Sequence, residues 1–171
     1  MAKLTPQEFY KVYAPYALKC QEETGLHYLA TLTQAALESS WAGQIIGTGN
    51  LFGIKDTDGV NGNEVEVITT EVLSTGNKVF AKTISIVKQG TKFLHTIRDY
   101  FRKYDSVEQG FKDHAKFFVD NSRYRKAWAY RTDAEAFLRL VADAGYATDP
   151  LYKEKLLGTL NWFIKYSKIV K

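Results

Sequence analysis

One segment of the chain changes from helical to strand-like patterning, and this change limits the folds open to the sequence. Residues 64–100 are rich in Val, Ile, Phe and Thr, and short runs with Gly, Ser and Asn divide them into three parts. We predict three antiparallel strands, roughly 64–73, 78–88 and 92–100, in a β-lobe of about 57–100. Helical patterns stand on both sides. The sequence therefore predicts an α+β fold, a single domain over residues 1–171, with a groove between a mainly helical lobe and a small β-hairpin lobe.

The first two helices have recognisable boundaries. Thr5-Pro6-Gln7-Glu8 is a capping box with Pro in the first turn, and Gly25 ends the helix that it opens. Its inner face is expected to hold Phe9, Val12, Tyr13, Tyr16, Ala17 and Cys20. A second helix is predicted from Tyr28 to Trp41, and its core positions are Leu29, Leu32, Ala35 and Ala36.

Three more helices are predicted after the strands. Ser106-x-x-Gln109 and Thr132-x-x-Glu135 have the spacing of capping boxes, and Gly145 is expected to end the helix that Thr132 opens. Asp149 is expected to cap the last helix. The inner face of that helix is predicted to be Leu157, Leu160, Phe163 and Ile164.

Composition excludes several classes of protein. The chain has one cysteine, Cys20, so no internal disulfide can form. We expect Cys20 to be a core residue. His27, His95 and His114 are far apart, so we expect no metal site, and nothing calls for a cofactor. No apolar run reaches the roughly 18 residues of a membrane span. The net charge of +4 is dispersed, which suits an anionic polymer but matches no nucleic-acid-binding motif.

Glu38 is the most informative polar residue. It follows an apolar helical run, and Gln34, Glu38 and Trp41 share one edge of the predicted helix. An apolar wall and the negative end of the helix dipole both disfavour a carboxylate, so we expect a raised pKa. A carboxyl with a raised pKa suits a general acid that protonates a glycosidic oxygen near neutral pH.

Four motifs together resemble a known family. In chain order they are Gln34-x-x-Leu37-Glu38-Ser39-x-Trp41, Asn50-Leu51-Phe52-Gly53-Ile54-Lys55, Phe101-Arg102-x-Tyr104 and Gly145-Tyr146-Ala147-Thr148-Asp149-Pro150-x-Tyr152. They resemble the bacterial endo-β-N-acetylglucosaminidases of glycoside hydrolase family 73, found in flagellar peptidoglycan hydrolases and autolysins. The resemblance covers about residues 6–165 and implies a lysozyme-like fold, in agreement with the two predicted lobes.

The resemblance also implies roles for single residues. Glu38 matches the general acid, and Tyr146 matches a tyrosine near the scissile sugar that affects catalysis. Substrate contacts are implied for the residues of the other motifs: Trp41, Asn50, Phe52, Tyr104 and Asp149. For several of these a structural role competes: Trp41 by packing on its helix, Phe52 in the core and Asp149 as a helix cap.

A second carboxylate is implied in the β-lobe. Thr69-Thr70-Glu71 fits the family's segment, whereas Glu64 and Glu66 are rivals of opposite strand parity to Glu71 unless a bulge intervenes. Glu71 as a base would give inversion and as a nucleophile retention. A third route uses the N-acetyl group of the substrate as nucleophile, with Tyr146 as the orienting group. The sequence leaves all three open.

Two departures from the family pattern stand out. Ser40 occupies a position where the family commonly has Gly, and Ala42 interrupts the usual Trp-Gly pair. The tryptophan that often follows the Phe-Gly-Ile-Lys segment is absent, since residues 57–62 read Thr-Asp-Gly-Val-Asn-Gly.

The sequence thus predicts a peptidoglycan hydrolase that cuts the β-1,4 bond after N-acetylglucosamine. Rivals are a muramidase or lytic transglycosylase on the same fold, and a non-catalytic wall-binding module. The expected partner is the peptidoglycan glycan strand, met by a monomer without nucleic acid or stable membrane insertion. The first residues lack the apolar core of a signal peptide. This suggests synthesis in the cytoplasm, delivery by a holin or a secretion system, and action at the cell wall.

Overall fold

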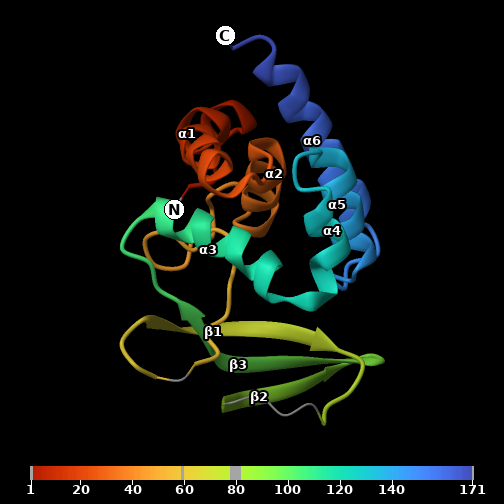
Figure 1. Ribbon diagram of the computed structural model, residues 1–171. Coiled ribbons are helices and arrows are strands. Elements are labelled where there is room, and N and C mark those ends of the chain that lie inside the picture. Colours follow the sequence, from red (N-terminus) through yellow and green to blue (C-terminus); the bar gives the residue numbers. More distant parts are fainter. Residues whose placement is uncertain (1, 59, 78–81, 171) are drawn as a thin grey trace. The chain divides into compact units, whose positions relative to one another are not determined.

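The computed structural model describes residues 2–58, 60–77 and 82–170, and these form two compact units (Figure 1). The helical unit comprises Met1–Gly53 and Tyr104–Lys171, and the sheet unit comprises Ile54–Lys103. The helical unit contains α1 (Pro6–Thr24), α2 (Tyr28–Glu38), α3 (Val107–Asp120), the 3-10 turn η1 (Ser122–Tyr124), α4 (Arg125–Ala129), α5 (Ala134–Asp143) and α6 (Tyr152–Ser167). None of the helices in the described ranges is long and apolar enough to cross a membrane. The predicted α+β composition is confirmed.

Helix α1 begins and ends as its sequence predicts. The Thr5 side chain accepts a hydrogen bond from the Glu8 amide, and the Glu8 carboxylate accepts one from the Thr5 amide at 2.8 Å. Gly25 follows the helix with φ 76°, a left-handed conformation that glycine adopts without strain. Of the predicted inner face, Val12 is 47% exposed and Tyr16 is half-buried, and the other residues are buried.

Helix α2 is buried almost all round, and its predicted core residues are fully or nearly fully enclosed. The helix ends at Glu38, however, and the prediction that it continues to Trp41 is wrong. Ser40, Trp41 and Ala42 adopt φ values of 50°, 60° and 65° in succession. This left-handed turn carries the Trp41 ring away from the helix axis to a site 5.6 Å from the Phe9 ring and 5.8 Å from Phe163.

Two glycines allow the chain after α2 to pack directly on α3. A Cβ at Gly49 would stand 2.4 Å from the Ser106 carbonyl oxygen, and one at Gly110 would stand 2.1 Å from the Gly49 carbonyl oxygen. Neither position has room for a side chain. The close approach buries Leu51 and Phe52, which are 0% and 3% exposed.

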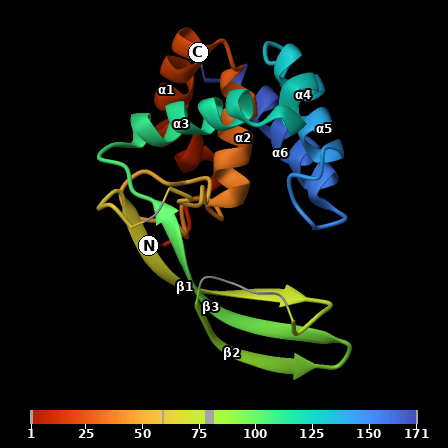
Figure 2. The ribbon, with the colours of Figure 1, turned by 60° about the horizontal axis from the view of Figure 1, so that its bottom comes forward.

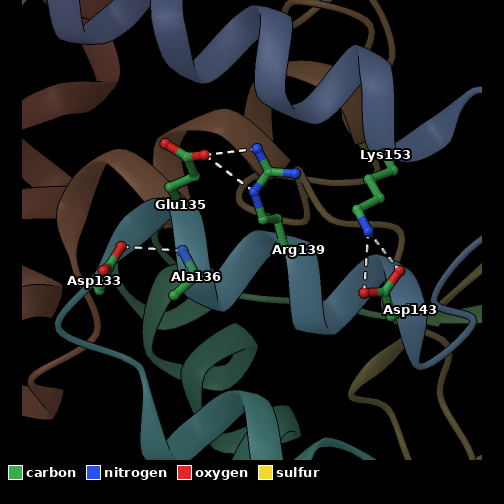
Figure 3. Close-up of polar contacts among 6 residues, drawn as sticks. All are labelled: Asp133, Glu135, Ala136, Arg139, Asp143 and Lys153. Carbon is green, nitrogen blue, oxygen red and sulfur yellow. Dashed lines mark hydrogen bonds and ion pairs between the residues drawn. The ribbon is translucent and has the colours of Figure 1, made fainter.

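The segment that carries Tyr146 joins α5 to α6. The cap of α5 is Asp133, whose carboxylate accepts from the Ala136 amide at 3.0 Å, so the predicted Thr132–Glu135 capping box is wrong and the helix begins one residue later. The Gly145 end is confirmed, with φ 76°. Lys153 of α6 binds Asp143 of α5 at 2.8 Å and joins the two ends of the segment (Figure 3).

Helix α6 differs from its prediction in two details. It begins at Tyr152, because the Asp149 carboxylate accepts from the Leu151 amide at 2.9 Å and caps the turn before the helix instead of the helix itself. Its buried residues are Tyr152, Leu156, Leu160 and Phe163, so Leu156 takes the place predicted for Leu157, and the predicted Ile164 is only half-buried. At Ser106, the hydroxyl caps α3 by accepting from the Gln109 amide, but the Gln109 side chain accepts from Asp105 rather than closing a capping box.

The sheet unit is a three-stranded antiparallel sheet with strand order β1-β3-β2 (Figures 1 and 2). Its strands are β1 (Glu64–Leu73), β2 (Lys82–Gln89) and β3 (Lys92–Arg102), close to those predicted. The predicted start of the second strand, 78–81, lies outside the described residues. Pairing of β1 with β3 runs without a break from Glu64 to Leu73, so Glu71 lies on the opposite face to Glu64 and Glu66.

Candidate active site

Glu38 and Tyr152 form the centre of a polar cluster in the helical unit. The Tyr152 hydroxyl, in the first turn of α6, donates to Oε1 of Glu38 at 2.7 Å, at the carboxyl end of α2. One helical turn before Glu38, Nε2 of Gln34 donates to the same hydroxyl at 3.4 Å. The predicted alignment of Gln34 and Glu38 on one helix edge is therefore used by a single partner from another helix.

Tyr146 forms the aromatic wall of this cluster. Its ring stacks on that of Tyr152, with centroids 5.8 Å apart and an interplanar angle of 10°. Phe117, Phe118 and Tyr124 surround its other sides at centroid distances of 6.0 to 6.1 Å. These aromatic rings keep bulk water from much of the space beside Glu38.

The surroundings raise the pKa values of all three central groups. Burial raises the pKa of Glu38 above its ordinary value, and the hydrogen bond from Tyr152 partly opposes that rise. Burial and the nearby Glu38 charge both raise the pKa values of Tyr146 and Tyr152. Both phenols therefore stay neutral, and Tyr152 keeps the hydrogen that it donates. Glu38 itself is only partly enclosed, so its carboxyl combines a raised pKa with access to a ligand.

Residues 14–163 match the glucosaminidase family, described as mannosyl-glycoprotein endo-beta-N-acetylglucosaminidase. The chain belongs to the glucosaminidase family. It is 32% identical over 158 residues to the peptidoglycan hydrolase FlgJ of Vibrio parahaemolyticus, a match that covers 90% of this chain and 46% of that protein. The chain thus spans less than half the length of this curated relative.

Two solved structures show the same fold. The glycoside hydrolase domain of FlgJ from Salmonella typhimurium matches with a TM-score of 0.71 and 26% identity, over 98% of this chain and 93% of that chain. A mutant of a peptidoglycan hydrolase from Sphingomonas sp. A1 matches with a TM-score of 0.66 and 34% identity, over 91% and 92%. The predicted resemblance and the predicted lysozyme-like α+β fold are both confirmed, and the chain is a member of a glycoside hydrolase family.

Several other residues of the glucosaminidase motifs lie in the interior of the helical unit. Phe52 is 3% exposed and stacks on the His114 ring at 3.9 Å. The Tyr104 hydroxyl donates to Asp113 at 2.5 Å, and Asn50, 1% exposed, exchanges backbone hydrogen bonds with Ile46. Trp41 packs between α1 and α6. Phe52, Tyr104 and Trp41 thus have packing or hydrogen-bonding partners within the helical unit.

The candidate second carboxylate, Glu71, is part of an ion-pair network in the sheet unit. Lys55 lies 3.3 Å from Glu71 and 2.5 Å from Asp99. Of the two rivals, Glu66 is paired with Arg98 at 2.8 Å, and Glu64 accepts backbone hydrogen bonds from Asn61 and Gly62. Across the described residues, no group of three His, Cys, Asp or Glu side chains is placed to hold a metal ion.

Sequence reasoning missed the part played by Tyr152. The residue closes the fourth motif, but its local pattern marks only the start of a helix. The one usable signal was the pair Gln34 and Glu38, two polar residues one turn apart on an otherwise apolar helix, which called for a polar partner from elsewhere. Nothing local identified that partner.

Proposed function

We propose that this glucosaminidase family member hydrolyses peptidoglycan strands at the β-1,4 bond after N-acetylglucosamine, with Glu38 as general acid. The raised pKa of Glu38 in its aromatic surroundings is the observation that carries the proposal. The family description supports the bond, and the FlgJ relatives support the polymer. A net charge of +4 favours approach to an anionic wall.

In this mechanism the protonated Glu38 carboxyl donates its proton to the glycosidic oxygen as the C1–O bond breaks. Positive charge develops on the sugar ring, and the leaving strand departs with a new hydroxyl. Tyr152 holds the carboxyl oxygen, and the stacked Tyr146 ring limits the water around it. The newly formed Glu38 carboxylate is stabilised by the hydrogen bond from Tyr152.

Glu71 is our candidate for the second group. It is the carboxyl group of the β-lobe segment that matches the family pattern, and Lys55 lies 3.3 Å from it. As a base it would activate water and invert the anomeric centre, and as a nucleophile it would retain the configuration. Attack by the N-acetyl group of the substrate also retains the configuration and needs no Glu71. The configuration of the first-formed product and the effect of Glu71→Gln together separate these three routes.

The test of the bond is digestion of purified peptidoglycan, reduction with borohydride and mass spectrometry of the fragments. Reduced N-acetylglucosamine ends are expected. Reduced muramic acid ends would instead indicate a muramidase, and 1,6-anhydro ends a lytic transglycosylase. Binding to the wall with no released fragment would indicate a wall-binding module, so each of these three results contradicts the proposal.

A further inference from the structure

Gln34 is a buried polar residue that the proposed chemistry does not yet use. Its side chain is 0% exposed on a helix whose other inward positions are mostly apolar or small. A buried amide is costly unless it is hydrogen-bonded, and an apolar residue of the same length would pack at this position without that cost. Among the described residues its Oε1 has no hydrogen-bond partner, whereas its Nε2 donates to Tyr152 at 3.4 Å. Tyr152 is thus the hydrogen-bond partner of the Gln34 amide.

The direction of this contact determines where the phenolic hydrogen goes. A phenol carries one hydrogen and accepts through its oxygen. Because Gln34 donates into the Tyr152 oxygen, the Tyr152 hydrogen is left for Glu38, which receives it at 2.7 Å. Hydrogen bonds in such a chain polarise one another, so a donor behind the phenol makes it a better donor to the carboxylate.

We propose that Gln34 is a positioning residue, and that it acts on the acid, Glu38, through Tyr152. Its amide fixes the Tyr152 hydroxyl as a donor to Glu38, holds the carboxyl in one orientation and limits the rise in its proton affinity that burial causes. The inference rests on the proposed role of Glu38 as general acid. It adds a residue that touches neither the substrate nor the acid itself.

The test uses Gln34→Met, which keeps the length of the side chain and removes the amide. The titration of Glu38 is followed by ¹³C NMR of its labelled side-chain carboxyl, a readout that needs no substrate. We expect the titration midpoint to move to higher pH, and the alkaline limb of the pH–rate profile to move with it. The plateau of kcat should fall about fivefold, the effect of one neutral hydrogen bond, with little change in KM.

The decisive comparison is made in a Tyr152→Phe background. Because Gln34 is proposed to act through the Tyr152 hydroxyl, Gln34→Met should cause no further shift of the Glu38 titration once that hydroxyl is gone. Thr31→Val is the matched control, because it too removes a buried polar group from α2. Unlike the Gln34 amide, the Thr31 hydroxyl has no hydrogen-bond partner in the described part of the chain, so its removal should leave the titration unchanged. Gln34→Asn, which withdraws the amide by one methylene, should shift the titration in the same direction and serves if Gln34→Met does not fold.

Two results would overturn the inference: a Glu38 titration that does not move in Gln34→Met or Gln34→Asn, or an equal shift with and without the Tyr152 hydroxyl. Failure of the proposed function has a different signature. In that case Glu38→Gln would cleave peptidoglycan as the wild type does, whatever the NMR titration shows.

Discussion

The Tyr152 hydroxyl and the Glu38 carboxylate, 114 positions apart in the sequence, share a hydrogen bond of 2.7 Å. The bond joins the first turn of α6 to the last turn of α2. Burial raises the pKa of Glu38 and the bond from Tyr152 lowers it, so the protonation of this carboxyl depends on how the two helices pack. The packing of the helical unit and its proposed chemistry therefore meet at one contact.

Removal of the Glu38 charge should stabilise the protein. Because the folded pKa lies above the unfolded one, ionisation of Glu38 costs stability as the pH rises through the folded pKa. Glu38→Gln lacks this cost, and its amide oxygen can still accept from Tyr152. We expect Tm of the variant to exceed that of the wild type by a margin that grows from pH 4 to pH 8. A margin independent of pH in thermal unfolding would contradict this account.

Glycine at Ser40 should also stabilise the fold. A left-handed conformation costs a residue with a Cβ roughly 1–2 kcal/mol, and Ser40 has φ 50°. Glycine also gives the unfolded chain more conformational freedom, which offsets part of this gain. We therefore expect Ser40→Gly to raise the free energy of unfolding, measured in urea, by about 0.5–1 kcal/mol. Ala35→Gly, within α2, should lose about 1 kcal/mol and serves as the control. A loss at both positions would show that the turn is not strained.

The buried His114 should make the protein sensitive to acid. Its ring is 0% exposed, its nitrogens have no hydrogen-bond partner in the described ranges, and burial lowers its pKa to about 3. Between the ordinary pKa of about 6.5 and that value, the unfolded chain binds the proton first. Stability is therefore lost as the pH falls through this window, by about 1.4 kcal/mol per pH unit from this group alone.

His114→Phe isolates that contribution. Phe preserves the stacking on Phe52 and does not titrate. The difference in unfolding free energy between the variant and the wild type should grow in favour of the variant from pH 6.5 to pH 4. Unfolding in urea across this range measures it, and parallel pH profiles for the two proteins would rule out the His114 term.

Glu71→Gln tests the proposed second carboxylate. If Glu71 acts as base or nucleophile, the substitution should lower kcat by about 10²–10⁴. Glu66→Gln is the matched control, because Glu66 lies on the opposite face of β1 and is also in an ion pair, with Arg98. This variant should retain near-wild-type activity. Full activity of Glu71→Gln would leave substrate assistance as the remaining route of the three.

The features that the sequence predicted correctly depend on local chemistry. The Thr5–Glu8 capping box and the Gly25 end of α1 lie within a few residues of each other, and both are confirmed. The end of α2 was predicted wrongly because Ser40 and Ala42 have side chains, and only glycine in those positions would have signalled a left-handed turn. The Glu38 environment was predicted in its direction, but Tyr152 was not identified as a partner, since its approach depends on how α6 packs on α2.

Comparison of Glu38→Gln with Glu22→Gln in digestion of purified peptidoglycan tests the central claim most directly. Glu22 is an exposed carboxylate on α1, so its substitution controls for the loss of one charge. The account predicts that Glu38→Gln lowers the rate of fragment release by about 10²–10⁴, whereas Glu22→Gln leaves it near that of the wild type. Release at the wild-type rate by folded Glu38→Gln would show that Glu38 is not the acid.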